Sequence, residues 1–143
     1  MENSEYRYTT TDAELEQLDF HDAVVLEVRQ QGRNVVLLLE WSILERDHPL
    51  NPYPNAQYTG ACRLTFYNVR FSQAKQHEKD QDLDVDPQRW RGFEILKLER
   101  KTVEGYEGFD LFVMVDTFCS WRLDADGFVL EWNELTGKAW FEE

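Results

Sequence analysis

The strongest constraint on the fold of this chain is an alternation of apolar and other residues with a period of two. From residue 24 to residue 29, every second residue is Val or Leu, as in a strand that buries one face. Segment 30–34 contains Gly32, which can adopt the positive φ that a hairpin turn needs. The return segment has an apolar alternate set: Val35, Leu37, Leu39, Trp41 and Ile43. We therefore predict a hairpin whose second strand runs over residues 35–43.

Five later segments also have strand patterns. Residues 61–71 and 93–103 alternate, whereas residues 109–115 are apolar on both sides and predict a central strand covered on both faces. Residues 119–123 and 128–135 flank an Asp-Ala-Asp-Gly sequence, which is a common hairpin turn. These last two segments predict a second hairpin.

Three segments have other patterns. Thr-Asp-Ala-Glu at residues 11–14 has the form of a capping box and predicts a short helix over residues 12–18. Residues 47–55 hold three of the four prolines, which lack a donor for a sheet, so we predict a loop there. Residues 72–91 are charged and aperiodic, and we expect a second long connection with a helical turn after Pro87.

The fold class that follows is mainly β. A chain of 143 residues is long enough for one domain with its own core, and we expect residues 1–143 to form a single domain. Six or seven strands in hairpin order predict an antiparallel twisted sheet forming a sandwich or partial barrel, with the short N-terminal helix against it. The residues expected to be buried are Val24, Leu26, Leu37, Leu39, Leu64, Phe66, Leu111, Val113, Trp121 and Leu130.

The charge of the chain is acidic and unevenly distributed. The net charge is −13, and residues 1–28 hold eight acidic residues and one basic residue. Residues 124–143 hold six acidic residues and one basic residue, whereas the middle is nearly balanced. Such a surface repels the phosphate backbone of nucleic acid and attracts a basic protein. The alternative is that the acidic residues only keep the domain soluble.

The start of the chain predicts a cytoplasmic protein. It has neither the basic region nor the apolar region of a signal peptide, and the longest apolar run, residues 35–39, is too short to cross a membrane. Cys62 and Cys119 lie in strand-like segments, where we expect buried free thiols in a reducing compartment. A single disulfide between them remains the alternative.

No pattern in the chain predicts catalysis, a metal or a cofactor. Four aspartates alternate from Asp80 to Asp86, but the EF-hand pattern fails because Val85 and Arg91 stand where Gly and Glu are needed. We therefore expect a solvated acidic loop. His21 and Asp22 are adjacent, so on an extended segment they point to opposite faces and do not form a dyad. The nucleophile, phosphate-binding and dinucleotide-binding motifs are missing from the sequence.

Aromatic residues in loops are the best candidates for a binding site, because such residues often anchor protein interfaces. The alternative for each is local packing under its own loop. The candidate partner-binding residues are Tyr53, Tyr58 and Trp90 as anchors, with Glu14, Glu16 and Asp19 as surrounding charges.

Two short segments carry a resemblance to a known group of proteins. Leu18-Asp-Phe-His-Asp-Ala-Val-Val25 resembles small bacterial proteins in which a Phe-His-Asp-Ala stretch leads into a β-hairpin. Leu64-Thr-Phe-Tyr-Asn-Val69 is similar to an inner strand of these proteins. Some members are grouped with immunity proteins of polymorphic toxin systems. The resemblance implies a cytoplasmic, protein-binding role and no catalytic residue.

Three functional hypotheses follow. The preferred one is a non-enzymatic acidic binding protein, an immunity-like inhibitor of a basic protein partner, that binds neither nucleic acid nor membrane. The second is a small-molecule binder or hydrolase with its site in a β-barrel mouth. The third is a structural homo-oligomeric module.

Overall fold

The computed structural model describes residues 6–103 and 106–140, which form fourteen β-strands and two 3-10 helices. The long strands are Tyr8–Thr11 (β1), Val24–Gln31 (β3), Asn34–Leu39 (β4), Cys62–Tyr67 (β7), Phe71–His77 (β8), Asp82–Val85 (β9), Phe93–Val103 (β10), Tyr106–Val115 (β11), Thr117–Asp124 (β12) and Gly127–Trp132 (β13). The two-residue strands are Leu18–Asp19 (β2), Ile43–Leu44 (β5), Gln57–Tyr58 (β6) and Gly137–Lys138 (β14), and the helices are Asp12–Gln17 (η1) and Pro87–Arg89 (η2).

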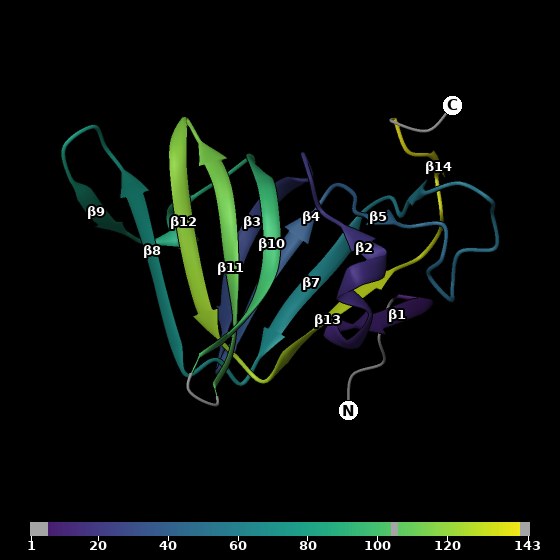
Figure 1. The fold of residues 1–143 in the computed structure, drawn as a ribbon, viewed down its shortest axis with the longest axis horizontal. Helices are drawn as coiled ribbons and strands as arrows, with labels where there is room; N and C mark the ends of the chain where they lie inside the picture. The colour runs from purple at the N-terminus through teal and green to yellow at the C-terminus, as the bar shows by residue number, and fades with distance from the viewer. Residues whose placement is uncertain (1–5, 104–105, 141–143) are drawn as a thin grey trace.

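The long strands form one antiparallel sheet that folds over itself. Its strand order is β1-β13-β7-β4-β3-β10-β11-β12-β8-β9, and the short strands form a second sheet in the order β14-β6-β5-β2. The two halves of the large sheet are joined where β3 pairs with β10 at only two positions, Phe93↔Val25 and Glu94↔Val24. Figure 1 shows β10, β11 and β12 in front of β3 and β4. The prediction of a mainly β, antiparallel fold with little helix is confirmed, and the sheet is not closed into a barrel. The second hairpin predicted from residues 119–123 and 128–135 is wrong, because β12 pairs with β11 and β8 whereas β13 pairs with β1 and β7, so the turn between them leads from one half of the sheet to the other.

An aromatic cluster holds the two halves together. Phe66 on β7 and Phe128 on β13 come from one half, and Phe109 on β11 comes from the other. The ring centroid of Phe109 lies 5.4 Å from that of Phe66 and 5.5 Å from that of Phe128. All three side chains are fully buried. The main core therefore lies between the inner faces of the folded sheet.

Eight of the ten residues predicted to be buried are buried, and the two exceptions lie on β3. The pairing of β3 with β4 shifts between Val25 and Glu27, so that Leu26 is an extra residue in a β-bulge. The bulge reverses the alternation, so Val25 and Val28 face the core, Leu26 is 46% exposed and Val24 is half-buried. The prediction for Val24 and Leu26 is therefore wrong.

Two predicted strands are shorter than expected because the chain turns. The return strand predicted over residues 35–43 ends at Leu39, and Ile43 instead begins β5 of the small sheet. The strand predicted over residues 61–71 is two strands, since Asn68 has φ 53° and reverses the chain between β7 and β8. The left-handed conformation is tolerated well by Asn.

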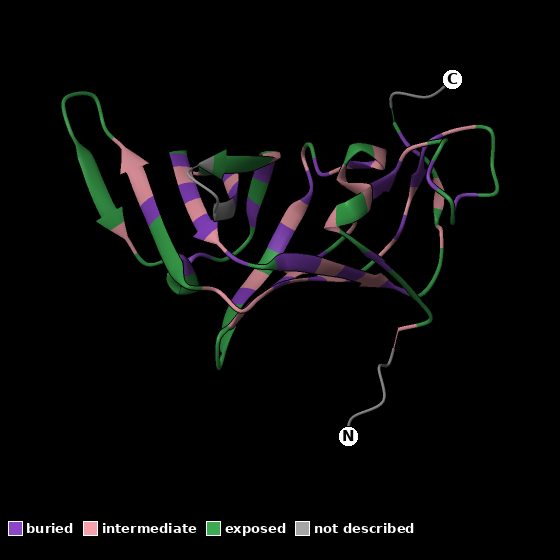
Figure 2. Ribbon diagram, turned by 60° about the horizontal axis from the view of Figure 1, so that its bottom comes forward, coloured by how far each residue is buried: buried purple, intermediate pink, exposed green. Residues whose placement is uncertain are grey.

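The charged segment 72–91 is mostly a hairpin and not a loop. It contains nearly all of β8, the whole of β9 and then η2. In Figures 1 and 2 this hairpin projects from the body of the molecule, and β9 is largely exposed. Its polarity follows from that exposure, because both faces of β9 meet solvent. The predicted helical turn after Pro87 is confirmed as η2, capped by Asp86 Oδ1, which accepts from Gln88 N at 3.0 Å.

The N-terminal helix is present, but as a 3-10 helix over Asp12–Gln17. Thr11 is its N-cap and accepts a hydrogen bond from Ala13 N at 3.3 Å. The reciprocal bond of a capping box is not made, because the Glu14 carboxylate turns toward His48. A six-residue helix of this kind depends on its tertiary contacts.

Strand β11 has one covered face only. Phe109, Leu111 and Val113 are buried, whereas Phe112 is half-buried and Met114 is 41% exposed. The prediction that this strand is covered on both faces is wrong. The alternating colours of the strands in Figure 2 show this one-sided burial.

Candidate functional site

A groove lies beside strand β1 at one edge of the large sheet. Its volume is about 270 Å³. We call it the aromatic groove, lined by Tyr8, Tyr53 and Trp132 with Leu50, Pro52 and Leu135, and by the polar residues Arg7, Asn133 and Glu134. Three separate segments of the chain build it: β1, the proline loop, and the end of β13 with the residues after it.

Pairing between β1 and β13 forms the aromatic floor of the groove. Tyr8 lies opposite Trp132 in the ladder, and their rings are stacked with centroids 5.9 Å apart and planes 26° apart. The pairing is extended by the Arg7 N–H, which donates to Asn133 Oδ1 at 2.9 Å. Tyr8 remains 43% exposed, so its outer face is available for contact.

Asn51 holds the proline loop that forms the other wall. Its Nδ2 donates to the carbonyl oxygens of Leu44, Glu45 and Asn55 at 3.3, 3.2 and 2.9 Å. Its Oδ1 accepts from Tyr53 N at 2.9 Å. One buried amide therefore fixes the loop around it, and the Tyr53 side chain, 52% exposed, stands at the groove.

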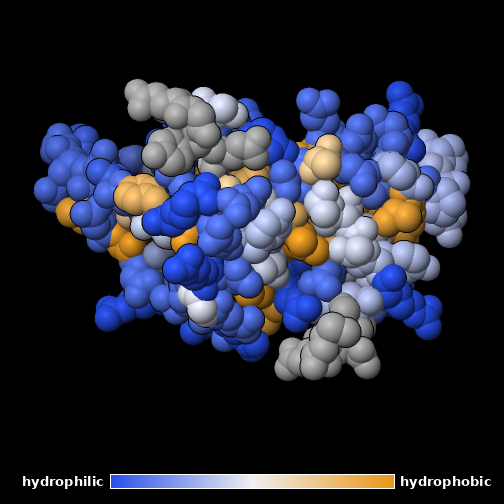
Figure 3. Space-filling view, turned by 90° about the horizontal axis from the view of Figure 1, so that it is seen from below, coloured by the Kyte–Doolittle hydropathy of each residue, from blue (hydrophilic) through white to orange (hydrophobic). Residues whose placement is uncertain are grey.

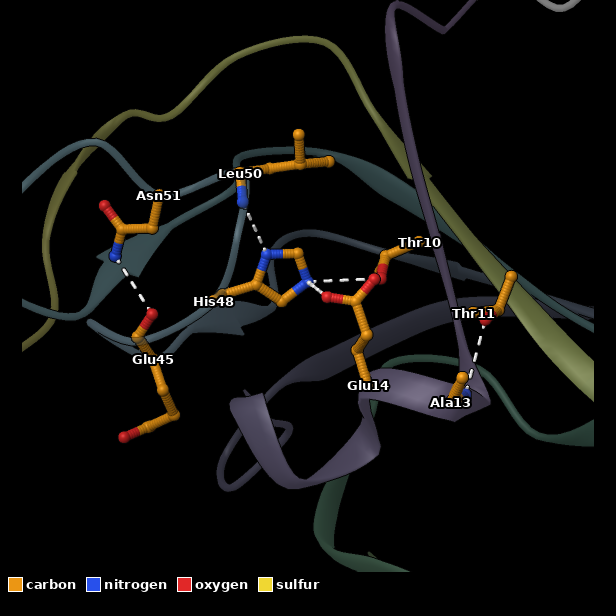
Figure 4. A network of polar contacts seen from close by, with 8 residues as sticks. All are labelled: Thr10, Thr11, Ala13, Glu14, Glu45, His48, Leu50 and Asn51. Carbon is orange, nitrogen blue, oxygen red and sulfur yellow. Dashed lines mark hydrogen bonds and ion pairs between the residues drawn. The ribbon is translucent and has the colours of Figure 1, made fainter.

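A buried histidine packs against Trp132 of the groove, and its polar contacts are drawn in Figure 4. The ring of His48 meets the edge of Trp132 with centroids 6.2 Å apart. Its Nδ1 accepts from Leu50 N at 3.0 Å, and its Nε2 lies 3.1 Å from Thr10 Oγ1 and 3.6 Å from Glu14 Oε2. Because Nδ1 is an acceptor, the proton of the neutral ring is on Nε2 and points toward Thr10. His48 thus connects the proline loop, β1 and η1.

Burial lowers the pKa of His48 below its ordinary value, and the nearby carboxylates of Glu14 and Asp47 oppose this shift without cancelling it. Protonation would also put a proton on Nδ1, the atom that accepts the hydrogen bond from the Leu50 N–H. The neutral form is therefore the form that fits the fold. A lowered pKa in the folded state means that the unfolded chain binds a proton first as the pH falls. Stability is complete above the unfolded-state pKa and decreases as the pH falls toward the folded-state pKa.

We expect this linkage to be measurable by comparing the wild type with His48→Asn. Asn can accept the Leu50 N–H through its Oδ1 but does not titrate. The free energy of unfolding of the wild type should fall more between about pH 7.5 and pH 5 than that of the variant. Urea denaturation at both pH values measures the difference. Equal losses in the two proteins would show that His48 does not contribute to the acid sensitivity.

The structure gives the three candidate aromatic anchors different environments. Tyr53 lines the aromatic groove. Tyr58 is half-buried on β6, edge-to-face with Trp41 at 4.9 Å, and its hydroxyl accepts from Trp140 N at 3.0 Å. Trp90 is only 8% exposed and packs on Phe93 and Trp121, so the expectation that it is an exposed anchor is wrong. Trp90 follows η2 directly, and this turn places the ring in the core.

The candidate charges lie near one another on η1 and β2. Glu14 contacts His48, and its Oε2 is buried without a hydrogen-bond partner among the described residues. Glu16 is exposed, and Asp19 Oδ1 accepts from His21 N at 2.8 Å. His21 and Asp22 also approach, with 3.4 Å between Nε2 and Oδ2, because Asp22 has φ 65° and leaves the extended conformation. Both are surface groups.

The β1–β13 pairing also brings the two acidic ends of the chain together. Some of their carboxylates are neutralised: Asp12 pairs with Arg100, Glu131 with Arg63 and Asp126 with Arg70. Glu16 and Glu134 form no salt bridge within the described part of the chain, and Glu134 lines the groove. Seen from below, the surface is mainly hydrophilic, with hydrophobic residues in small separate groups (Figure 3).

Sequence reasoning did not identify Tyr8 and Trp132 as site residues. Trp132 belongs to a segment predicted as part of the second hairpin, and Tyr8 precedes the first predicted element. Their pairing joins residues far apart in the chain. The available signal was the aromatic character of the first described residues, Tyr6-Arg-Tyr8, close to a capping sequence.

Burial limits the reactivity of the two cysteines. Cys62 and Cys119 are free and buried, and burial raises the pKa of Cys62 to about 11, so that its thiol stays protonated.

Among residues 6–103 and 106–140, no group of three or more His, Cys, Asp and Glu side chains is arranged to hold a metal ion. None of the helices in these ranges has the length and apolar character needed to span a membrane.

Comparisons with protein-family models, with curated proteins and with solved structures gave no match.

Proposed function

We propose that this chain is an acidic protein-binding domain, an immunity-like inhibitor of a basic protein, that acts through the aromatic groove without chemistry at that site. The observation that carries the proposal is the exposure of Tyr8 and Tyr53 on either side of a groove built over Trp132. Tyr and Trp are the residues that most often dominate protein interfaces, because each buries a large area and keeps few rotamers.

The shape of the groove supports a protein segment as its ligand. Its volume of about 270 Å³ is below the range of roughly 300–1,000 Å³ of small-molecule sites, and it is open to solvent. The large sheet is not closed into a barrel, which supports this reading over a site in a barrel mouth. Strand β1 is the edge strand beside the groove, and an edge strand can pair with an extended segment of a partner.

The charge around the groove supports a basic partner. Glu134 lies in the groove together with Arg7, and Glu16 and Asp19 add two carboxylates on η1 and β2. Exposed carboxylates of this kind accelerate the approach of a basic protein and do little after contact. The buried free cysteines and the Phe-His-Asp-Ala resemblance support the cytoplasmic, bacterial setting that belongs to the same proposal.

The test is a kinetic comparison with a partner recovered from bacterial lysate and then purified. Replacing Tyr8 or Tyr53 with Ala should weaken binding by about 2 kcal/mol or more, which is roughly 30-fold, mainly through faster dissociation. The triple change Glu16→Gln, Asp19→Asn and Glu134→Gln should slow association at low salt and have little effect at high salt. Biolayer interferometry at two salt concentrations measures both rates.

Phe71→Ala is the matched control, because Phe71 is an exposed aromatic at the opposite half of the sheet. It should leave both rates unchanged. If the three aromatic variants behave alike, the groove is not the binding surface. If native mass shows only self-association, the homo-oligomeric alternative replaces the inhibitor.

A further inference from the structure

The outer face of the other half of the sheet carries a serine, a histidine and an aspartate in one hydrogen-bonded chain. His77 lies opposite Asp82 in the β8–β9 ladder, and its Nδ1 is 2.8 Å from Asp82 Oδ1. Its Nε2 is 2.7 Å from the Oγ of Ser120 on the neighbouring strand β12. These three groups face solvent on the side of the sheet away from the buried Cys119 and Trp121.

The direction of the hydrogen bonds is set by Asp82. An ionised carboxylate only accepts, so the proton of the neutral imidazole is on Nδ1 and the lone pair is on Nε2. The Ser120 hydroxyl then donates to Nε2. This is the arrangement in which a histidine can remove the proton of a serine that attacks a carbonyl carbon, while the aspartate holds the ring and stabilises its charged form.

The neighbours of Ser120 in the ladders supply the other parts of a reaction site. Lys75 on β8 is its direct cross-strand partner, and Phe112 on β11 is its partner on the other side. The rings of Phe112 and Phe118 stack with centroids 6.1 Å apart, and the His77 ring lies 5.4 Å from Phe118. An apolar platform therefore lies beside Ser120, and Lys75 is its neighbour in the ladder, with Asp84 opposite Lys75 on the other side.

We propose that Ser120 is a nucleophile and that this face hydrolyses esters of small hydrophobic acids. Ser120 Oγ attacks the ester carbonyl carbon while its proton passes to His77 Nε2, and the Lys75 ammonium stabilises the oxyanion. The C–O bond to the alcohol breaks, and the alcohol leaves with the proton from His77. Water then attacks the acyl-Ser120 ester, His77 takes and returns its proton, and the carboxylic acid is released. Ester and water become acid and alcohol without a cofactor.

The activity goes beyond the proposed binding function and uses the opposite half of the sheet. The hydrolase alternative from the sequence analysis then has its site on an open face of the sheet and not in a barrel mouth. The backbone N–H groups of a paired strand are engaged in its ladder, so Lys75 is the donor available to the oxyanion. A single general base contributes about 10²–10⁴-fold, and we expect an enzyme of that modest power.

The test uses the full chain, p-nitrophenyl butyrate and a fluorophosphonate probe. Ser120→Ala and His77→Gln should each lower kcat/KM about 100-fold or more, and Ser120→Ala should abolish probe labelling in the intact mass. Asp82→Asn, which changes a positioning residue, should lower kcat with little change in KM. Ser72→Ala is the control, because Ser72 is exposed on β8 and its hydroxyl accepts from Trp121 Nε1 and has no contact with a histidine among the described residues.

A second measurement separates reactivity from folding. Ser120→Cys keeps a nucleophile beside His77, and we expect iodoacetamide to alkylate it about 10-fold faster than Ser72→Cys, although Ser120 is the less exposed position. Both variants should have the far-UV circular dichroism of the wild type. Equal alkylation rates, or ester hydrolysis and labelling that persist in Ser120→Ala, overturn the proposal and leave the groove unaffected.

Discussion

Replacing Phe109 with Ala is expected to lower the free energy of unfolding by about 3–5 kcal/mol, the range for truncating a buried Phe. Phe109 belongs to the half of the sheet formed by β10, β11, β12, β8 and β9. Its ring meets the rings of Phe66 and Phe128 in the other half. The halves share two paired positions in the ladder and two backbone hydrogen bonds between residues 22–23 and Ile95, so side-chain packing makes a large contribution to their association. The Arg100 guanidinium also lies 5.5 Å from the Phe109 ring centroid and would lose that contact.

Urea denaturation followed by tryptophan fluorescence measures this loss. Phe71→Ala is the matched control, because Phe71 is 45% exposed at the start of β8 and its truncation should cost less than about 1 kcal/mol. A loss below about 1 kcal/mol for Phe109→Ala would show that the two halves do not depend on this cluster.

The second large effect is expected at Asp12, where three elements meet. Asp12 is in η1, its Oδ1 accepts from Phe128 N of β13 at 3.0 Å, and its Oδ2 pairs with Arg100 of β10 at 3.1 Å. The side chain is only 15% exposed. Removing it in Asp12→Ala leaves the buried Phe128 N–H without its acceptor and takes the carboxylate away from Arg100, which keeps its hydrogen bond to the Asp12 carbonyl oxygen, and we expect a loss of about 3 kcal/mol.

Asp126→Ala provides the comparison for Asp12→Ala. The pKa of Asp126 is lowered by hydrogen bonds from Asn68 and Arg70, so it too is an ionised partner of an arginine, but it lies on the surface. Surface ion pairs contribute little to stability because solvent screens them, so this variant should be nearly as stable as the wild type. Similar losses in the two variants, measured by the same urea titration, would contradict a special role for Asp12.

The candidate site was partly accessible to sequence reasoning. Tyr53 was selected because it is an aromatic residue in a proline-rich loop, and the structure places it at the groove. Trp90, predicted as an anchor in the charged connection 72–91, is buried, because a loop position does not determine whether a ring turns outward. His77 and Ser120 are 43 residues apart, and nothing local to either predicts their hydrogen bond.

The sequence by itself determined the class of fold and most of the core. Alternation with a period of two is a local property, because successive side chains of a strand point to opposite faces, so the segments around Leu37, Leu64 and Leu130 could be recognised as strands with one buried face. The turn residues between β12 and β13 are equally local, but they fix only that the chain turns, and the predicted pairing of these two strands does not occur.

The tertiary structure alone decided which face of β3 is buried, the strand order and the sites. A single bulged residue, Leu26, exchanges the two faces of its strand, and the bulge is visible only in the pairing of β3 with β4. The groove exists because β1 pairs with β13, and the serine face exists because β8 and β9 pair beside β12. Contacts of this kind join residues far apart in the chain, and their partners are set by the packing of the whole sheet.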